Sequence, residues 1–207
     1  MPEILCVNIV DKGTSGFVRE RRERRDELAA DADVVELTAD EARPEHVRDT
    51  IADHEATAPF SMLAYIGHGD PGILYYQHKL GLEMLTQYDS PDSLRELVRQ
   101  RTIYIFACKS MTPEFAGVLL QAEASRAAGF TASPRYSDLN GRRRLADFDT
   151  YLIKALHRGD TRETILTTRD TLVEEARADR KKDWGPRYKA SLTQFVTALQ
   201  SFDIYES

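Results

Sequence analysis

Residues 61–69 read SMLAYIGHG and residues 102–110 read TIYIFACKS, and these two stretches decide the fold. Each opens with a short, almost wholly apolar run, which is typical of a strand buried on both faces of a parallel sheet. His68 comes just after the first run, in a cluster of turn-forming residues, and Cys108 comes just after the second. If the two strands are neighbours, roughly 5 Å apart, both side chains emerge at one sheet edge.

The same alternation of apolar runs and amphipathic segments extends over the first two-thirds of the chain. It predicts further strands over 3–10, 33–38 and 130–133, and helices over 17–30, 43–56, 91–100 and 113–127. Residues 71–92 show no regular pattern, and we expect a small hairpin or an ordered loop there. Residues 133–146 are expected to form a second irregular segment. The expected fold class is therefore α/β: a mostly parallel sheet with helices on both faces, in three layers.

From about residue 146 onward the pattern is helical only, over 146–158, 160–178 and 185–201. No linker rich in Pro, Gly or Ser separates these helices from the preceding part. We therefore expect a single domain spanning residues 1–207, with the helices of 146–201 packed on it.

Composition excludes several classes of function. A hydrophobic fraction of 42% suits one compact core, and a net charge of −6 disfavours a general nucleic-acid binder. No run approaches the roughly 20 apolar residues that span a bilayer, and the first residues lack a signal-peptide layout, so we expect no membrane partner and a cytoplasmic location. The two cysteines, Cys6 and Cys108, lack CxxC spacing, which makes a structural zinc site an unfavourable interpretation.

A thiol beside an imidazole is the minimum apparatus for nucleophilic acyl transfer. Cys108 would supply the thiolate, and His68 would accept its proton or deliver one to a leaving amine. The sequence Thr112-Pro-Glu-Phe115 predicts a helix start, whose partial positive charge would favour the thiolate. The N–H groups of Gly69 and Cys108 are the candidate oxyanion donors.

Ordinary structural roles compete with this interpretation. A histidine in a glycine-rich turn is usually a turn residue, and a cysteine at a strand end is usually a packed thiol. The joint placement on adjacent strands favours the catalytic interpretation for His68 and Cys108. Cys6 lies in mid-strand and is expected in the core. The remaining histidines show no metal-ligand spacing, and Asp147 and Asp149 are expected to cap a helix.

The two motifs also resemble a known group. Tyr65-Ile-Gly-His-Gly69 and Phe106-Ala-Cys-Lys-Ser110, with His68 and Cys108 40 residues apart (108 − 68), resemble the paired motifs of clan CD cysteine peptidases. That clan includes caspases, metacaspases, legumain, gingipain, separase and the bacterial CHAT proteins. The order of segments after Cys108, Gly129–Ser133, then Asp147–Leu156, then Gly159–Thr164, is similar to the CHAT layout.

The resemblance implies a caspase-like fold and a cysteine endopeptidase. It implies that His68 is the general base or acid, that Cys108 is the nucleophile, and that Gly69 and Cys108 offer oxyanion N–H groups. It further implies hydrolysis of a peptide bond in a protein substrate, with no metal and no organic cofactor. A place in a bacterial defence or stress system, with an activating partner protein, is also part of what it implies.

The substrate preference stays open at the level of sequence. Many relatives carry a polar or acidic residue before Ala-Cys, where this chain has Phe106. Asp70 beside the histidine would favour a basic side chain at P1, the substrate residue before the scissile bond. Arg135 or Arg142 would favour an acidic one.

Two alternatives remain. The first is a catalytically silent caspase-like module that acts as a binding or scaffold protein. The second is a flavodoxin- or response-regulator-like domain that binds a small anion at the same sheet edge. Its candidate loop is Asp11-Lys-Gly-Thr-Ser-Gly16, which follows the first strand but lacks the full P-loop spacing.

Overall fold

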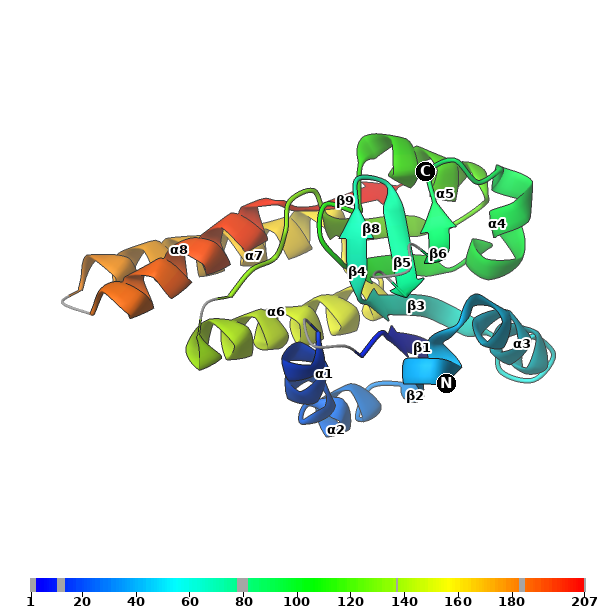
Figure 1. The fold of residues 1–207 in the computed structure, drawn as a ribbon, viewed down its shortest axis with the longest axis horizontal. Coiled ribbons are helices and arrows are strands. Elements are labelled where there is room, and N and C mark those ends of the chain that lie inside the picture. Colours follow the sequence, from blue (N-terminus) through cyan, green and yellow to red (C-terminus); the bar gives the residue numbers. More distant parts are fainter. Residues whose placement is uncertain (1–2, 11–13, 78–81, 137, 183–184, 207) are drawn as a thin grey trace.

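A six-stranded sheet forms the centre of the molecule (Figure 1). The computed structural model describes residues 3–10, 14–77, 82–136, 138–182 and 185–206. The strand order is β2-β1-β3-β7-β8-β9; neighbouring strands pair in parallel except β8 and β9, which are antiparallel. The bounds are β1 (Glu3–Asn8), β2 (Asp33–Thr38), β3 (Phe60–Ile66), β7 (Thr102–Phe106), β8 (Arg126–Phe130) and β9 (Phe202–Glu206). The predicted α/β class with a mostly parallel sheet is confirmed.

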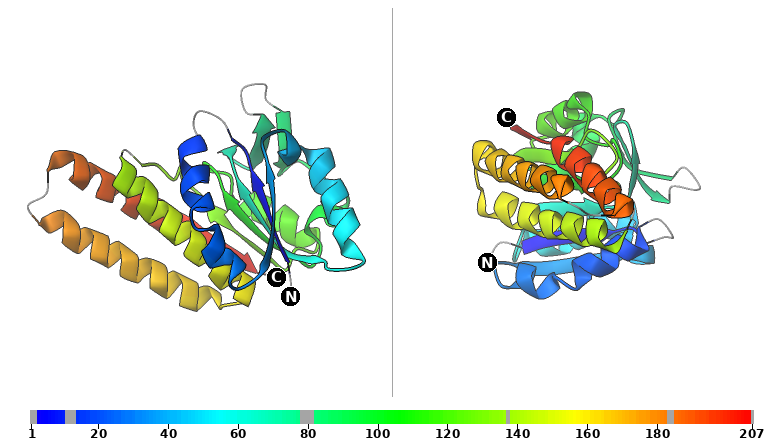
Figure 2. Two further views of the ribbon diagram at one scale, coloured as in Figure 1. Left: turned by 90° about the horizontal axis from the view of Figure 1, so that it is seen from below. Right: turned by 90° about the vertical axis from the view of Figure 1, so that its left-hand side faces the viewer.

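Helices cover both faces of this sheet, as the two views of Figure 2 show. One face is covered by α1 (Ser15–Arg22), α2 (Arg25–Ala29), α6 (Leu139–Arg158), α7 (Arg162–Lys181) and α8 (Pro186–Gln200). The other is covered by the 3-10 helix η1 (Ala39–Ala42), α3 (Pro44–Glu55), α4 (Pro91–Val98) and α5 (Pro113–Gln121). Successive residues of a strand enter opposite cores: Met62 and Ala64 face α6, whereas Leu63 and Tyr65 face α3. The strands are therefore apolar on both faces.

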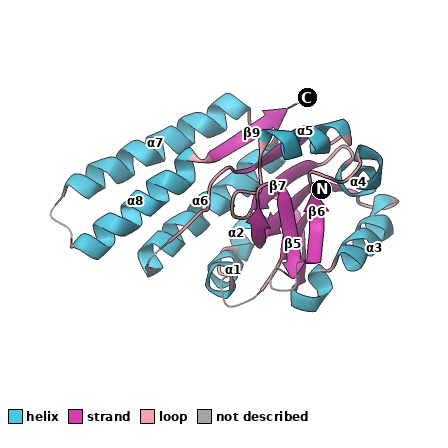
Figure 3. Ribbon diagram, turned by 45° about the horizontal axis from the view of Figure 1, so that its top comes forward, coloured by secondary structure: helices cyan, strands magenta, loops and turns pink. Residues whose placement is uncertain are grey.

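A second, smaller sheet lies next to the end of β3. It consists of the antiparallel strands β4 (His68–Asp70), β5 (Ile73–Gln77) and β6 (Leu82–Thr86), which Figure 3 shows beside the main sheet. Leu74 and Leu85 are buried in the same core as α3, α4 and α5. The predicted hairpin in segment 71–92 is confirmed, and β4 extends it back to His68.

The predicted single helix over 17–30 is wrong, because the chain forms α1 and α2 with a break at Glu23 and Arg24. The Arg24 guanidinium donates a hydrogen bond of 2.7 Å to the carbonyl oxygen of Glu20, and another to Asp147. Arg24 thereby satisfies a carbonyl at the end of α1 and ties the break to α6. The amphipathic pattern that predicted one helix over 17–30 did not reveal this bend.

The predicted helix over 113–127 is also too long, and the strand expected at 130–133 begins at Arg126 instead. Glu123 has a φ of 68°, a left-handed conformation that ends the helical stretch. The small residues that follow, including Gly129, belong to the buried strand β8. A Cβ on Gly129 would lie 2.8 Å from the carbonyl oxygen of Ile105 on the neighbouring strand. Alanine-rich sequence favoured a helix locally, and tertiary packing overrode it.

Two elements near the C-terminal end were missed. Helix α6 begins at Leu139, inside the stretch 133–146 that was expected to be irregular, and Asp138 caps it by accepting a hydrogen bond of 2.7 Å from the Gly141 N–H. Strand β9 follows α8, where only helices were expected. Phe202 and Ile204 are buried and alternate with more exposed residues, which is the period of a strand.

The helices after residue 138 differ in how they meet the sheet. Helix α6 packs along it through Leu145, Leu152 and Ile153, which lie in the same buried cluster as the strand residues. Helices α7 and α8 lie side by side and extend beyond the sheet (Figure 2). Across the described ranges, no helix is both long enough and apolar enough to cross a membrane.

A buried ion pair connects α1 to α6. Arg21 Nε lies 3.2 Å from Asp149 Oδ2, and the two side chains are 4% and 0% exposed. Tyr104 donates a hydrogen bond of 2.8 Å to the same carboxylate, and Arg21 donates one of 3.0 Å to Asn8. Burial raises the pKa of Asp149, and Arg21 and Tyr104 oppose that rise. The expectation that Asp147 and Asp149 cap a helix is wrong, because both lie inside α6 and bind arginines.

Replacing Arg21 by Met should destabilise the protein by about 3–5 kcal/mol, because the change leaves the Asp149 carboxylate buried without its cation. Chemical denaturation of both proteins measures the difference. Arg22→Met is the matched control: Arg22 is half exposed in its pair with Glu36, so we expect a loss of at most about 1 kcal/mol. Equal effects of the two substitutions would contradict a special role for the buried pair.

Candidate active site

The ends of β3 and β7 bring His68 and Cys108 into one cleft. These strands are parallel neighbours, and their last paired residues are Ile66 and Phe106. The Gly67 N–H donates a hydrogen bond of 3.2 Å to the Phe106 carbonyl, which continues the ladder past the strand ends. His68 and Cys108 are both partly exposed and line the same cleft, whose volume is about 90 Å³. The adjacency that the sequence predicted for the two strands is confirmed.

Cys108 lies on a tight turn between β7 and α5. The next residue, Lys109, has a φ of 52°, which is left-handed and strained for a residue with a side chain. Backbone hydrogen bonds hold the turn against the loop after β8: Lys109 N–H donates to Ala132 at 3.4 Å, and Met111 N–H donates to Phe130 at 3.3 Å. The turn thus exposes the thiol while its backbone is fixed by the neighbouring strand.

Gly69 lies directly against this turn. A Cβ at that position would be 2.9 Å from the Cys108 carbonyl oxygen and 3.0 Å from Ser110 Cβ. Only glycine lets the backbone after His68 approach the backbone after Cys108 this closely. The glycine that the sequence singled out beside His68 therefore holds the two segments in contact.

Helix α5 begins where the sequence predicted. Thr112 is its N-cap, with Oγ1 accepting a hydrogen bond of 3.1 Å from the Phe115 N–H, and Pro113 occupies the first position. Thr112 Oγ1 also donates a hydrogen bond of 3.2 Å to Gln87, which follows the small sheet. The start of α5 is thus tied both to the turn at Cys108 and to β6.

The charged residues considered for substrate binding lie elsewhere. Asp70 is exposed and accepts a hydrogen bond of 3.2 Å from the Tyr75 hydroxyl. Arg135 is exposed in the segment before α6. Arg142 donates two hydrogen bonds, of 3.2 and 3.1 Å, to the buried Glu20 carboxylate. None of these three is among the residues that line the cleft.

Several side chains of the cleft were not found from the sequence. Phe17 comes from α1, and Pro134 and Tyr136 come from the loop after β8. Phe17 stacks on Phe106 with ring centroids 4.2 Å apart, and Tyr136 stacks on Phe17 at 6.4 Å. The sequence signal that could have found them is Phe106 itself, because a large aromatic residue two positions before Cys108 needs neighbours on the same face of the sheet.

The other ionisable candidates have structural surroundings. Cys6 is 3% exposed in the middle of β1, and burial raises the pKa of its thiol. The His54 Nδ1–H donates a hydrogen bond of 2.9 Å to the Thr50 carbonyl, and the His157 ring lies 3.2 Å from the Ser61 hydroxyl. His78 and residues 11–13 of the proposed anion-binding loop lie outside the described residues. Within the described ranges, no group of three or more metal-ligating side chains occurs.

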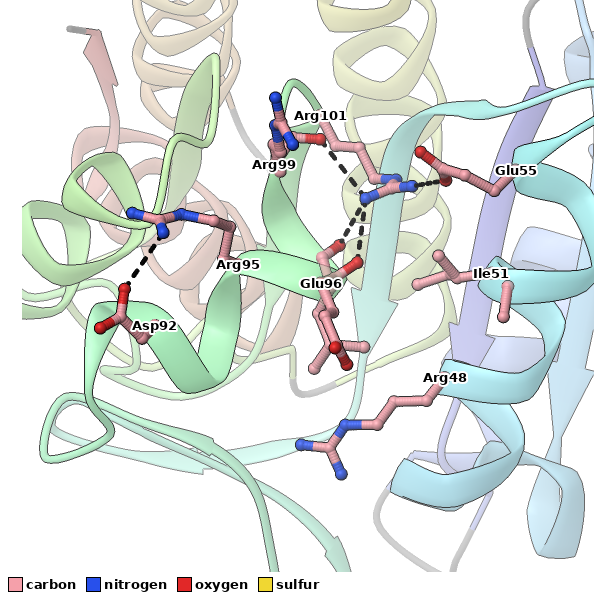
Figure 4. A pocket seen from close by; sticks show the side chains of 10 residues that line it. Arg48, Ile51, Glu55, Asp92, Arg95, Glu96, Arg99 and Arg101 are labelled. Carbon is pink, nitrogen blue, oxygen red and sulfur yellow. Dashed lines mark hydrogen bonds and ion pairs between the residues drawn. The ribbon is translucent and has the colours of Figure 1, made fainter.

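A larger pocket of about 540 Å³ lies between α3 and α4 (Figure 4). Its charged side chains are largely paired with one another: Arg101 binds Glu55 and the Glu96 carbonyl, and Arg95 lies 3.1 Å from Asp92. Arg101 directly precedes β7, so this pocket lies at the opposite end of the strand from Cys108. The described residues that line it include no cysteine, histidine or serine, so it offers no nucleophile or general base of that kind.

Comparisons with known proteins give one structural likeness. No family model matches the chain, and no curated protein matches it. Among solved structures, the chain is similar to an inactive zymogen of a C11 protease from Parabacteroides distasonis, with 14% identity and a TM-score of 0.49. The match covers 64% of this chain and 49% of that one, so this chain spans about half of that protein.

The two thiols should react very differently in the folded protein. Cys108 is partly exposed, whereas Cys6 is buried with a raised thiol pKa and so holds little thiolate at neutral pH. Iodoacetamide followed by intact mass spectrometry should therefore add one label, which is absent in Cys108→Ala and retained in Cys6→Ala. Two rapid labels, or labelling at Cys6 first, would contradict this assignment.

Proposed function

We propose that this chain is a cysteine endopeptidase that hydrolyses a peptide bond in a protein substrate through His68 and Cys108. One observation supports the proposal above the others: of the two cysteines, both among the described residues, only Cys108 is partly exposed, and its thiol shares a single cleft with an imidazole at the edge where two parallel strands end. Ligands of open α/β sheets bind at this edge. A thiol and an imidazole so placed are sufficient for acyl transfer.

The reaction would proceed in two stages. His68 first accepts the proton of the Cys108 thiol. The thiolate attacks the carbonyl carbon of the scissile bond, and His68 donates that proton to the leaving amine as the carbon–nitrogen bond breaks. The product is a thioester on Cys108 and a free amine. Water then attacks the thioester while His68 accepts a proton from it, the carbon–sulfur bond breaks to release the carboxylic acid, and His68 returns the proton to the sulfur to restore the thiol.

The oxyanion formed in each stage needs hydrogen-bond donors. The N–H groups of Gly69 and Cys108 are our candidates, because Gly69 directly follows His68 and its backbone lies against that of Cys108, an approach that only glycine allows. The strained turn at Lys109 and its bonds to the loop after β8 would keep the Cys108 N–H in place during the reaction. Such preorganised donors cost no rearrangement when negative charge develops.

The resemblance of the two motifs to clan CD peptidases supports the same assignment, with the CHAT group as the relative that we favour. On that basis we include in the proposal a caspase-like single domain, a cytoplasmic place in a bacterial defence or stress system, and activation by a partner protein. We assign no metal or organic cofactor to the reaction. The proposed substrate is a protein or peptide, with no role for nucleic acid or membrane.

Cys108→Ala should abolish peptide cleavage, with kcat/KM lower by about 10³-fold or more, because the nucleophile is removed. His68→Ala should cause a comparable loss while leaving Cys108 accessible to iodoacetamide. The measurement is cleavage profiling on a peptide library, alone and beside the products of neighbouring genes. The controls are Cys6→Ala and His46→Ala, whose side chains lie in the core and on the surface.

The outcome of this experiment also separates the proposal from its alternative. A correctly folded wild type that cleaves nothing in a Cys108-dependent way, even with its partners present, would instead support a silent caspase-like binding or scaffold module. Cleavage that persists in Cys108→Ala would mean that the nucleophile has been assigned wrongly.

Gly69→Ala should lower kcat by about 10- to 100-fold, because the added methyl group would push the backbone away from Cys108 and displace a candidate oxyanion donor. Steady-state kinetics with the best library peptide measures the effect. Gly117→Ala is the matched control, since a Cβ there meets no atom within 4 Å. Unchanged kcat in Gly69→Ala would exclude Gly69 from the oxyanion site.

A further inference from the structure

The wall of the cleft that holds His68 and Cys108 is poorly suited to binding a charged side chain. Apart from the two functional residues, its described lining is aromatic, aliphatic or neutral. It consists of Thr14, Phe17, Ile66, Gly67, Phe106, Ala107, Pro134 and Tyr136.

Three aromatic rings make one side of this wall. Phe17 stacks between Phe106 and Tyr136, and Phe106 in turn meets Phe130 edge-on with centroids 5.1 Å apart. Phe17 and Phe106 are 2% and 6% exposed, so their rings form the inner end of the cleft, and Tyr136 is half buried. Burial also raises the pKa of the Tyr136 hydroxyl, and the charge of Arg142 opposes that rise.

Apart from His68 and Cys108, the described lining holds no group that could neutralise a charged substrate side chain. The lining holds no Asp, Glu, Lys or Arg, and the nearby Glu20 and Arg142 already bind each other. A charge moved from water into such surroundings without a partner is strongly disfavoured. An apolar side chain gains free energy there in proportion to the area that it buries.

The volume of the cleft limits the size of that side chain. An apolar cavity of about 150 Å³ accommodates benzene, whereas this cleft measures about 90 Å³. An unbranched or branched aliphatic chain of three or four heavy atoms fits the smaller space better than an aromatic ring does.

We propose that this aromatic-walled cleft binds the side chain of the P1 residue of the substrate and selects an aliphatic one, such as Leu, Met or Val. The inference rests on the proposed peptidase function, because Cys108 attacks the carbonyl of the residue whose side chain enters the cleft. It replaces the two charged preferences that Asp70 and Arg135 suggested from the sequence.

The test is a set of fluorogenic peptides that differ only at P1, cleaved by the full chain. Leu, Met and Val should be cleaved at least 100-fold faster than Asp, Glu, Arg or Lys, and Phe about 10-fold slower than Leu. Faster cleavage after a charged residue would overturn the P1 inference and leave the peptidase proposal intact. Absence of Cys108-dependent cleavage for every P1 residue would overturn both.

Two variants test the wall itself. Tyr136→Asp places a carboxylate beside the cleft and should raise cleavage after Arg and Lys by at least 10-fold relative to Leu. Phe17→Leu should raise the rate of cleavage after Phe relative to Leu, because a smaller side chain replaces the ring that limits the space in the cleft. Tyr88→Asp, at a residue that is 79% exposed and absent from the cleft lining, is the matched control for added charge.

Circular dichroism establishes that each variant is folded before its rates are compared. Unchanged P1 preference in both folded variants would show that the side chain binds elsewhere, and would overturn the inference. A shift of the same size in Tyr88→Asp would also overturn it, because the effect would then come from net charge alone.

Discussion

The parallel pairing of β3 with β7 is the constraint on which the rest of the structure depends. Its register places Ile66 opposite Phe106, so the residues two positions further along each strand, His68 and Cys108, leave the sheet together. A shift of one residue would send one of these side chains to the opposite face of the sheet. Burial on both faces fixes the register, because each strand residue has its own neighbours in one of the two cores. The chemistry therefore follows from packing that lies some distance from the cleft.

Helix α1 has a second role, because it lines the cleft as well as covering the sheet. Phe17 projects from α1 into the stack with Phe106, and α1 is held against α6 by buried charges, Arg21 with Asp149 and Arg142 with Glu20. Buried ion pairs contribute little net stability but penalise any arrangement that separates them. They fix the position of α1 relative to the sheet, and so they fix one wall of the cleft.

The sequence predicted the parts of this structure that depend on local pattern. The two apolar runs and the residues that follow them located β3, β7, His68 and Cys108, and the cap at Thr112 located the start of α5. It failed where distant contacts decide, as at Ala127 and Ala128, where helix-favouring residues form a buried strand. The next residue, Gly129, lies so close to β7 that a Cβ would be 2.8 Å from the Ile105 carbonyl oxygen. The cleft wall was missed for the same reason, since Phe17 and Tyr136 reach Phe106 only through the tertiary fold.

Strand β9 has a consequence for the order in which the molecule assembles. It pairs with β8 across residues 131–201, so its partners are further apart in the sequence than those of any parallel pair in the sheet. Contacts between residues far apart in the sequence form slowly, because the entropy lost in closing a long loop opposes them. Until then β8 has an open edge, and β8 with the loop behind it supplies the carbonyls that hold Lys109 and Met111. The turn that presents Cys108 is therefore held by a strand whose outer edge is covered by β9, from the other end of the chain.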